Sequence, residues 1–195
     1  MQKNSFVFIG DSLTYGYGVN KNNNWVESLN PFIPLDIINK GINGNTTTDM
    51  LNRFTEDVIS YSPKKIFIMG GTNDFLSNRS LDSVLDNLEL MLKEALTITK
   101  DVIIGIPPII IKEDAYRLFM QSSTYDYCEK QLQLLGKSII ELCNKYTVTY
   151  VNFYSLTFKF SSNNIFIDGI HLNNNGQNLL LNEFKQLLKN MDSTL

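Results

Sequence analysis

Cysteine and histidine are both scarce in this chain of 195 residues. The two cysteines, Cys128 and Cys143, fit neither a disulfide framework nor a Cys-x-x-Cys pair, which argues against a disulfide-stapled fold and a dithiol redox centre. With only one histidine, the chain also offers too few ligands of the usual kind for a zinc site. We therefore expect two reduced core thiols, no bound metal and no cofactor.

A basic surplus and long apolar runs are absent as well. The formal net charge is -3, so the chain has little with which to neutralise phosphates, and we expect no nucleic-acid partner. No apolar run approaches the roughly 20 residues of a membrane span, and the first residues lack the pattern of a signal peptide. We expect a cytoplasmic protein without stable membrane insertion, and the sequence leaves formation of a homo-oligomer open.

The chain does have enough apolar residues, 43% of the total, for one well-buried core, so residues 1–195 are expected to form a single domain. Short apolar, β-branched runs predict buried strands, and segments with helical periodicity lie between them. The strands are expected at residues 6–9, 35–38, 66–69, 102–106 and 148–151, and the helices at 25–29, 46–59, 81–97, 128–146 and after Asn175. This alternation predicts a parallel sheet with helices on both faces, whose site lies at the carboxyl ends of the strands.

Ser12 lies where the first predicted strand passes into a turn. A serine there commonly caps a helix, and it becomes a nucleophile only when a base reaches its hydroxyl. His171 is the only histidine, the residue type whose unperturbed pKa suits proton transfer near neutral pH. Asp168, three residues earlier, can accept the proton on Nδ1 of the imidazole and fix its tautomer. These residues predict a serine hydrolase with Ser12 as nucleophile and His171 as base.

Two loops hold candidate donors for the oxyanion of such a reaction. Residues 39–46 follow the second predicted strand and contain Gly41 and Gly44, either of which can bring a backbone N–H close to a ligand. Residues 70–74 follow the third strand and contain Asn73, whose side-chain amide is a donor. All of these are also ordinary turn residues, and the residues alone do not choose between the two glycines.

Four short blocks, in order and each at a predicted strand end, together resemble the GDSL, or SGNH, hydrolase superfamily. The blocks are Gly10-Asp11-Ser12-Leu13, Gly44 within residues 39–46, Gly71-Thr72-Asn73-Asp74, and Asp168-Gly169-Ile170-His171. The resemblance implies a three-layer α/β/α sandwich with a flavodoxin-like, parallel five-stranded sheet. It also implies an acyl-enzyme on Ser12, catalysis by Ser12, Asp168 and His171, and an oxyanion hole made by the Ser12 and Gly44 N–H groups and the Asn73 side chain.

The expected substrate is a small-molecule carboxylic ester or thioester. Members of the superfamily act on lysophospholipids, acyl thioesters, aryl esters and acetylated sugars, so the resemblance selects none of these. Candidates for the substrate pocket are Asp11, Tyr15, Phe75 and Ile170, with Tyr17, Leu76 and residues 115–127 and 158–166 as a wider set. Any of the aromatic residues among them can equally belong to the core.

Two other functions were weighed against the hydrolase. Asp11 and Asp74, both at predicted strand ends, suit the Mg²⁺ of a phosphohydrolase, but that function leaves His171 without a role. An α/β scaffold also hosts nucleotide- or flavin-binding modules, yet neither G-x-G-x-x-G nor G-x-x-x-x-G-K-[ST] follows any predicted strand. The absence of a G-x-S-x-G segment likewise disfavours the α/β-hydrolase fold. The ester hydrolase is therefore the preferred prediction.

Overall fold

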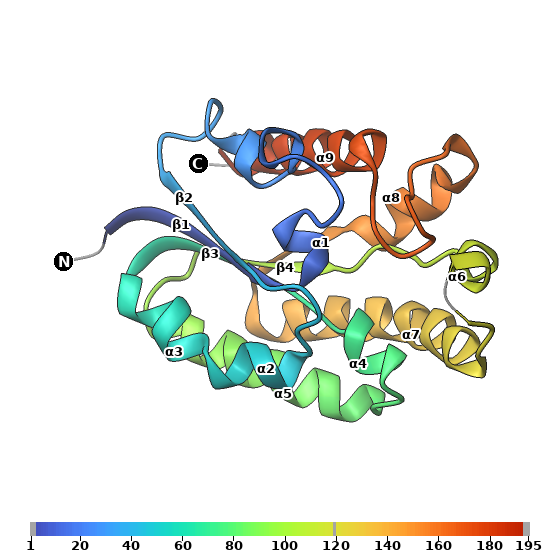
Figure 1. Cartoon of the computed structure of the whole chain (residues 1–195). Helices are drawn as coiled ribbons and strands as arrows, with labels where there is room; N and C mark the ends of the chain where they lie inside the picture. The colour runs from blue at the N-terminus through green and yellow to red at the C-terminus, as the bar shows by residue number, and fades with distance from the viewer. Residues whose placement is uncertain (1–2, 119, 193–195) are drawn as a thin grey trace.

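The computed structural model describes residues 3–118 and 120–192. The apolar runs form a five-stranded sheet in the order β2-β1-β3-β4-β5, and every neighbouring pair is parallel (Figure 1). The strands are β1 (Lys3–Gly10), β2 (Asp36–Gly41), β3 (Pro63–Met69), β4 (Val102–Ile106) and β5 (Thr149–Asn152). The predicted fold class and all five predicted strands are confirmed, with ends that differ by at most three residues and with β4 matching at both ends.

Helices cover both faces of the sheet, as Figure 1 shows. On one face lie α2 (Thr47–Asn52), α3 (Phe54–Asp57), α4 (Thr72–Leu76), α5 (Leu81–Leu96) and α7 (Ser123–Tyr146). On the other lie α1 (Ser12–Tyr15), α8 (Phe153–Lys159) and α9 (Asn174–Asp192), while α6 (Lys112–Leu118) lies beyond the end of β4. Short 3-10 turns occupy Lys21–Asn23, Glu27–Leu29, Ile59–Tyr61 and Ser161–Asn163. Among the described residues, no helix combines the length and apolarity needed to cross a membrane.

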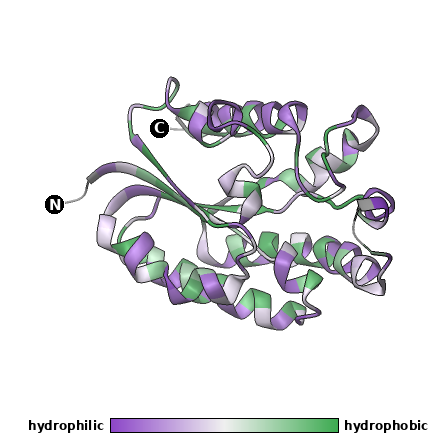
Figure 2. Cartoon of the chain, in the orientation of Figure 1, coloured by the Kyte–Doolittle hydropathy of each residue, from purple (hydrophilic) through white to green (hydrophobic). Residues whose placement is uncertain are grey.

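The sheet is buried on both faces because its strands carry apolar side chains at successive positions. Val7 and Ile9 of β1 pack in the core under α2, α5 and α7, whereas Phe6 and Phe8 pack in the core under α9. Successive side chains of a strand point to opposite faces, so a continuous apolar run supplies both cores. Figure 2 shows the complementary pattern on the helices, which alternate hydrophobic and hydrophilic residues along their length.

The core under α9 is rich in aromatic residues. Phe184 of α9 is fully buried, and its ring lies 5.3 Å from Trp25, 5.5 Å from Phe67 and 5.6 Å from Phe8 between centroids. Several of these pairs have edge-on geometry, which suits the quadrupoles of aromatic rings. The cluster joins the C-terminal helix, two central strands and the segment after α1 into one packed unit.

Two predicted helices differ from the observed elements. Residues 25–29 form only a 3-10 turn, because the Asn24 side chain accepts hydrogen bonds from the N–H groups of Val26 and Glu27 and so stabilises a turn. Residues 46–59 do not form one helix, since the chain leaves helical geometry at Arg53, which separates α2 from α3. The predicted helix at 128–146 begins earlier, at Ser123, where the Ser122 side chain caps α7.

The strand order places the ends of β1 and β3 side by side at the centre of the sheet. Gly10, the last residue of β1, pairs with Gly41 of β2 and with Met69 of β3. The chain runs from β1 to β2 on one side and then returns to β3 on the other, which makes this position the topological switch point where α/β folds bind ligands. Ser12 and Asn73 follow these two strand ends.

Candidate active site

Ser12 is the first residue of α1, a helix of four residues that follows β1 almost directly. Asp11 caps this helix, because its carboxylate accepts a 2.8 Å hydrogen bond from the Leu13 N–H. Ser12 itself has no partner for its N–H within the helix, since the first N–H groups of any helix lack one. The turn therefore places the hydroxyl and the N–H of Ser12, a residue that is only 6% exposed, at the carboxyl edge of the sheet, and the N–H has no partner within α1.

Side chains from other segments hold α1 in place at its last carbonyl groups. Trp25 Nε1 donates a 3.0 Å hydrogen bond to the Leu13 carbonyl, and the amides of Asn24 and Asn39 both donate to the Thr14 carbonyl. Such contacts satisfy acceptors that a short helix leaves open. The sequence analysis did not identify these three side chains, because nothing in their local pattern indicates which distant carbonyl they reach.

The structure brings Ser12, His171 and Asp168 together. His171 Nε2 lies 3.0 Å from Ser12 Oγ, and His171 Nδ1 lies 2.7 Å from Asp168 Oδ2. Both contacts are satisfied when Nδ1 carries the proton, because Ser12 Oγ–H then donates to Nε2 and Nδ1–H donates to the carboxylate. A hydroxyl, an imidazole and a carboxylate in this arrangement can activate an oxygen nucleophile.

The other oxygen of Asp168 fixes the loop that carries His171. Asp168 Oδ1 accepts the N–H groups of Ile170, at 2.9 Å, and His171, at 2.7 Å. Burial opposes the charge of this carboxylate, but these hydrogen bonds and the one from the His171 ring outweigh it and hold the pKa of Asp168 below its ordinary value. Gly169 between them has φ +81° and its Cα lies against Ile111 and Ala115, so a side chain there would meet backbone atoms.

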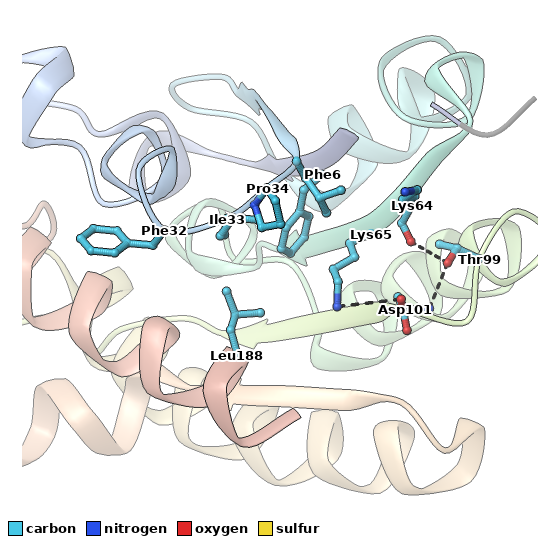
Figure 3. Close-up of a pocket in the computed structure, with 10 residues that line it drawn as sticks. Phe6, Phe32, Ile33, Pro34, Lys64, Lys65, Thr99, Asp101 and Leu188 are labelled. Atoms are coloured by element: carbon cyan, nitrogen blue, oxygen red, sulfur yellow. Dashed lines mark hydrogen bonds and ion pairs between the residues drawn. The ribbon is translucent and has the colours of Figure 1, made fainter. Parts of the chain in front are cut away.

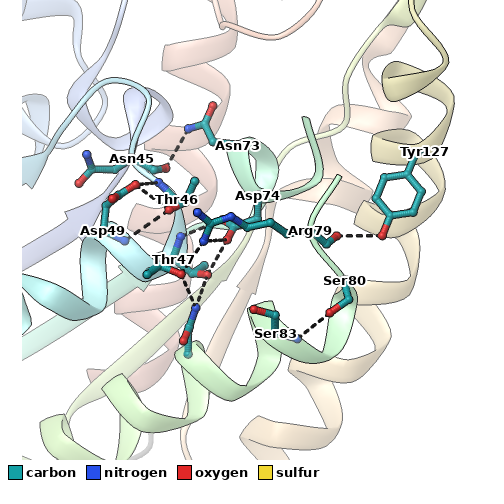
Figure 4. Close-up of polar contacts among 12 residues, drawn as sticks. Asn45, Thr46, Thr47, Asp49, Asn73, Asp74, Arg79, Ser80, Ser83 and Tyr127 are labelled. Carbon is teal, nitrogen blue, oxygen red and sulfur yellow. Dashed lines mark hydrogen bonds and ion pairs between the residues drawn. The ribbon is translucent and has the colours of Figure 1, made fainter. Parts of the chain in front are cut away.

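A second loop, residues 42–45, follows β2 and contacts Gly10 at the end of β1; we name it the oxyanion loop because it contains Gly44, a predicted oxyanion donor. It begins where the Ile42 N–H donates to the Gly10 carbonyl at 3.1 Å, and it closes where the Asn45 N–H donates to the Ile42 carbonyl at 3.2 Å. Gly44 lies within this turn at φ +78°, a left-handed conformation that favours glycine. Asn73 Nδ2 donates a 2.9 Å hydrogen bond to the Asn45 carbonyl (Figure 4), which leaves its second hydrogen available.

The hydrogen bonds of Gly41 and Gly44 show which of the two has a free backbone N–H, a choice that the sequence alone leaves open. The Gly41 N–H donates to the Asn39 side chain at 2.9 Å, and its Cα is packed against Tyr15. The Gly44 N–H, by contrast, has no hydrogen-bond partner among the residues that the structure describes. Gly44 therefore offers a free backbone donor and Gly41 does not.

Asp74, next to Asn73, anchors the start of α2. Its two carboxylate oxygens accept hydrogen bonds from the Thr47 N–H and the Thr47 hydroxyl, each at 2.8 Å (Figure 4). Arg79 Nη1 lies 3.9 Å from Asp74 Oδ1. Burial raises the pKa of Asp74 above its ordinary value, although these hydrogen bonds oppose the rise. The oxygens of Asp74 are engaged in the fold, and one oxygen of Asp11 caps α1, so the two carboxylates do not form an open Mg²⁺ site.

Two of the residues expected in the substrate pocket belong to the interior instead. Phe75 is fully buried in the core under α5 and α7, and Asp11 is almost fully buried beneath α1. Both lie next to site residues in sequence, but their short helices turn the side chains inward. Tyr15 is exposed, and it lines a cavity of about 330 Å³ between α1 and the end of β2.

A different cavity lies next to Ile170, the residue before His171, and to Leu76 of α4. It has a volume of about 340 Å³ and is lined by Leu76, Ser122, Thr124, Tyr125 and Ile170. Ile170 directly precedes His171, and Leu76 lies one turn after Asn73 on α4. Ile170 thus lines a cavity, and its place in the substrate pocket stays a prediction. Ser122, Thr124 and Tyr125 fall in the wider candidate segment 115–127, of which Phe119 lies outside the described residues. The Tyr17 ring packs against His171, with 4.4 Å between the centroids of the two rings.

A further pocket, with a volume of about 370 Å³ and a mixed polar and apolar lining, lies near the starts of β3 and β4. Figure 3 shows the residues that line it. Its walls include Phe6 near the start of β1, Lys65 near the start of β3, and Asp101 just before β4, with Phe32 and Leu188 completing the apolar side. These residues lie at the amino ends of the strands, whereas Ser12 lies at the carboxyl end of β1. This pocket is therefore not part of the site that holds Ser12 and His171.

A family model matches most of this chain in sequence, and two known proteins match shorter stretches of it. A model of the GDSL-like Lipase/Acylhydrolase family matches residues 8–179. An acetylxylan esterase of Geobacillus stearothermophilus is 33% identical over 87 residues, which is 42% of this chain and 40% of that protein. An uncharacterized lipoprotein, YqeF of Bacillus subtilis (strain 168), is 58% identical over 40 residues, 20% of this chain and 16% of that one. The matches thus span less than half the length of either relative.

Solved structures resemble the chain in fold. A member of the lipolytic G-D-S-L family from Veillonella parvula superposes with a TM-score of 0.79 at 23% identity, covering 92% of this chain and 94% of that one. The acetylxylan esterase Axe2 from Geobacillus stearothermophilus superposes with a TM-score of 0.77 at 20% identity, covering 95% and 94%. At these identities the superpositions establish a shared architecture.

Proposed function

This chain belongs to the GDSL-like lipase/acylhydrolase family, and from that premise we propose that it hydrolyses short-chain carboxylic esters through an acyl-enzyme on Ser12. The observation that carries the proposal is the continuous chain of contacts from Ser12 Oγ through the His171 ring to Asp168, at 3.0 Å and 2.7 Å. A serine hydroxyl is a weak nucleophile unless a base removes its proton, and here the base lies within hydrogen-bond distance.

In the acylation step, His171 Nε2 takes the proton of Ser12 as Oγ attacks the ester carbonyl. The tetrahedral intermediate then collapses, and the imidazolium gives this proton to the leaving alcohol. In deacylation the imidazole takes a proton from water, which attacks the acyl-enzyme, and returns the proton to Ser12 Oγ. Asp168 remains ionised throughout, consistent with its lowered pKa, and stabilises the imidazolium.

The oxyanion of each intermediate would be held by three donors. They are the N–H groups of Ser12 and Gly44 and the second hydrogen of the Asn73 amide. The hydrogen bond from Asn73 to the Asn45 carbonyl supports this role, because it fixes the amide against the loop that contains Gly44. Fixed donors of this kind need no reorganisation when negative charge develops on the carbonyl oxygen.

The surroundings of Ser12 favour a small acyl group and an alcohol rich in hydroxyls. The flanking cavity of about 340 Å³ is lined by Leu76 and Ile170 together with Ser122, Thr124 and Tyr125, and its small volume suits a short acyl group better than a long alkyl chain. Tyr15 and Tyr17 are about half exposed; Tyr15 lines the separate cavity between α1 and the end of β2, and the Tyr17 ring packs against His171, so both offer aromatic rings on which a sugar can pack. The acetylxylan esterase of Geobacillus stearothermophilus, 33% identical over its matched stretch, gives independent support for acetylated carbohydrates.

The proposal is tested with a substrate panel on the wild type and on Ser12→Ala. The panel contains nitrophenyl esters from acetyl to decanoyl, acetylated xylo-oligosaccharides, and acetyl and long-chain acyl-CoA thioesters. We expect the acetyl esters to give the highest kcat/KM, and Ser12→Ala to lose nearly all turnover while it keeps the wild-type melting temperature. A fluorophosphonate should label the wild type and not the variant.

Two results would contradict different parts of the proposal. Most of the esterase activity surviving in Ser12→Ala would refute the catalytic assignment. A kcat/KM that rises steadily with acyl chain length, or that is highest for thioesters, would refute the substrate class and leave the catalytic assignment standing.

A further inference from the structure

Arg53 is a largely buried cation whose position at the break between α2 and α3 has a specific consequence for the site. Its side chain is 15% exposed, and each part of its guanidinium faces a different partner. Nε donates to the Asn45 side chain at 2.8 Å, Nη2 donates to the Gly10 carbonyl at 3.0 Å, and Nη1 pairs with Asp57 at 2.7 Å. One planar group thus joins the oxyanion loop, the end of β1 and helix α3.

Two of these partners adjoin the groups that the proposed chemistry uses. Gly10 is separated from Ser12 only by Asp11, so its carbonyl marks the end of the strand that delivers the nucleophile. Asn45 directly follows Gly44, and the Asn45 carbonyl is also the acceptor for Asn73 (Figure 4). The Asn45 residue is therefore held from one side by Arg53 and from the other by Asn73.

The oxyanion loop has few other attachments at this end. The Ile42 N–H donates to the same Gly10 carbonyl oxygen as Arg53 does. Both ends of the loop are therefore attached to this one atom of β1, Ile42 directly and Asn45 through Arg53. Gly44 itself is exposed, and a Cβ there would meet nothing within 4 Å. Because no packing surrounds Gly44, the direction of its N–H depends on how Asn45 and Ile42 are held.

From this geometry we propose that Arg53 is a positioning residue for ester hydrolysis. Its guanidinium holds the oxyanion loop at a fixed distance from the end of β1 and so aims the Gly44 N–H at the oxyanion formed on Ser12. This inference rests on the function proposed above, since it assigns Arg53 a part in stabilising that oxyanion. A lysine cannot replace it, because an ammonium is a point charge without the planar fork that reaches three acceptors.

The contact with Asp57 supplies a matched control. Lys40 Nζ pairs with the other oxygen of Asp57 at 2.9 Å, so Lys40 and Arg53 share one carboxylate, which holds its charge. Burial opposes that charge, but the two cations outweigh it and lower the pKa of Asp57. Lys40 makes none of the contacts with Gly10 or Asn45. Lys40→Met therefore removes the ion pair with Asp57 and the cation–π contact with Tyr61, neither of which involves Gly10 or Asn45, whereas Arg53→Lys keeps the positive charge and removes the fork.

The test compares kcat and KM for nitrophenyl acetate in the wild type, Arg53→Lys, Lys40→Met, Asn45→Ala and the Arg53→Lys/Asn45→Ala double variant. We expect Arg53→Lys to lower kcat about tenfold to a hundredfold with little change in KM, because a small misplacement of catalytic groups is costly. Lys40→Met should stay within about twofold of the wild type, because the contacts of Lys40 with Asp57 and Tyr61 do not reach the oxyanion loop. In the Asn45→Ala background, Arg53→Lys should lower kcat by less than about threefold, since residues that act through one contact are not additive.

The rate at which a fluorophosphonate labels Ser12 is measured in parallel, because its phosphonyl oxygen enters the same donors as the oxyanion. Thermal unfolding of each variant separates loss of fold from loss of rate. Wild-type kcat and labelling rate in Arg53→Lys would overturn the inference, as would an equal loss in Lys40→Met, or the same Arg53→Lys factor in both backgrounds. A wild-type chain that neither cleaves the esters nor takes the label would instead overturn the proposed function, and this inference with it.

Discussion

At the scale of single residues, Asp168 combines a structural role with a chemical one. Its Oδ1 holds the backbone of the His171 loop through two N–H groups, while its Oδ2 faces the imidazole. The two oxygens can therefore be separated by a substitution that keeps one of them. Asparagine retains an oxygen that can accept the backbone N–H groups and replaces the other oxygen by an amide donor.

Asp168→Asn should consequently fold normally and lose activity. An amide donor facing Nδ1 favours the tautomer with the proton on Nε2, which cannot accept the Ser12 proton. We expect kcat for nitrophenyl acetate to fall by about 10²–10⁴, in line with the same change in other catalytic triads, with a melting temperature close to that of the wild type. Retention of more than about a tenth of the wild-type kcat would mean that Asp168 does not set the tautomer of His171.

Asp11 gives the molecule a predictable dependence of stability on pH. Burial raises the pKa of Asp11 to about 6 from its ordinary 3.8, so between these values the folded state binds more protons than the unfolded state. The free energy of unfolding therefore falls as pH rises through this range and levels off above it. The difference between the two pKa values corresponds to a loss of about 3 kcal/mol.

Asp11→Asn isolates this contribution, because its amide oxygen can still cap α1 and it does not titrate. Urea unfolding of both proteins is measured between about pH 4 and pH 8. We expect the free energy of unfolding of the variant minus that of the wild type to be smallest near pH 4 and to grow as pH rises toward 8. A difference between the two proteins that stays constant with pH would show that Asp11 has the same pKa folded and unfolded.

At the scale of elements, the sequence was most informative where apolar runs are long. The run at residues 6–9 predicts a buried strand because a parallel sheet buries both faces, and the helical period at 81–97 matches α5, Leu81–Leu96, almost to the residue. Short helices were not found. Helix α6, Lys112–Leu118, and helix α8, Phe153–Lys159, are too brief to show a full apolar period.

The site was predictable to a similar degree and for related reasons. Ser12, Asn73, Asp168 and His171 could be identified because each lies in a short block at the end of a predicted strand or loop, where chemistry limits the residue types. Arg53 could not, because its function depends on contacts with residues 8 and 43 positions away in the chain. The break that it occupies between α2 and α3 also looks, in sequence, like the middle of one helix.

At the scale of the whole molecule, the active edge of the sheet depends on the aromatic core behind it. Trp25 packs in that core against Phe184, and its ring nitrogen donates to the Leu13 carbonyl of the nucleophile helix. A change deep under α9 can therefore reach α1 through a single side chain. The single domain and the cytoplasmic location remain predictions from the sequence, which leaves formation of a homo-oligomer open.

Phe184→Ala tests whether this core sets the stability of the molecule and of its site together. Phe184 is fully buried with ring contacts to strands and to Trp25, so the truncation leaves a cavity and should lower the free energy of unfolding by about 3–5 kcal/mol. Phe158→Ala is the matched control, because the same truncation at a side chain that is 66% exposed should change stability by less than about 0.5 kcal/mol. Urea unfolding gives both values, and esterase activity measured against temperature should fall in Phe184→Ala several degrees below the wild type. Equal urea midpoints for the two variants would contradict the central role of the aromatic core, and an unchanged temperature profile of activity would contradict its connection to α1 through Trp25.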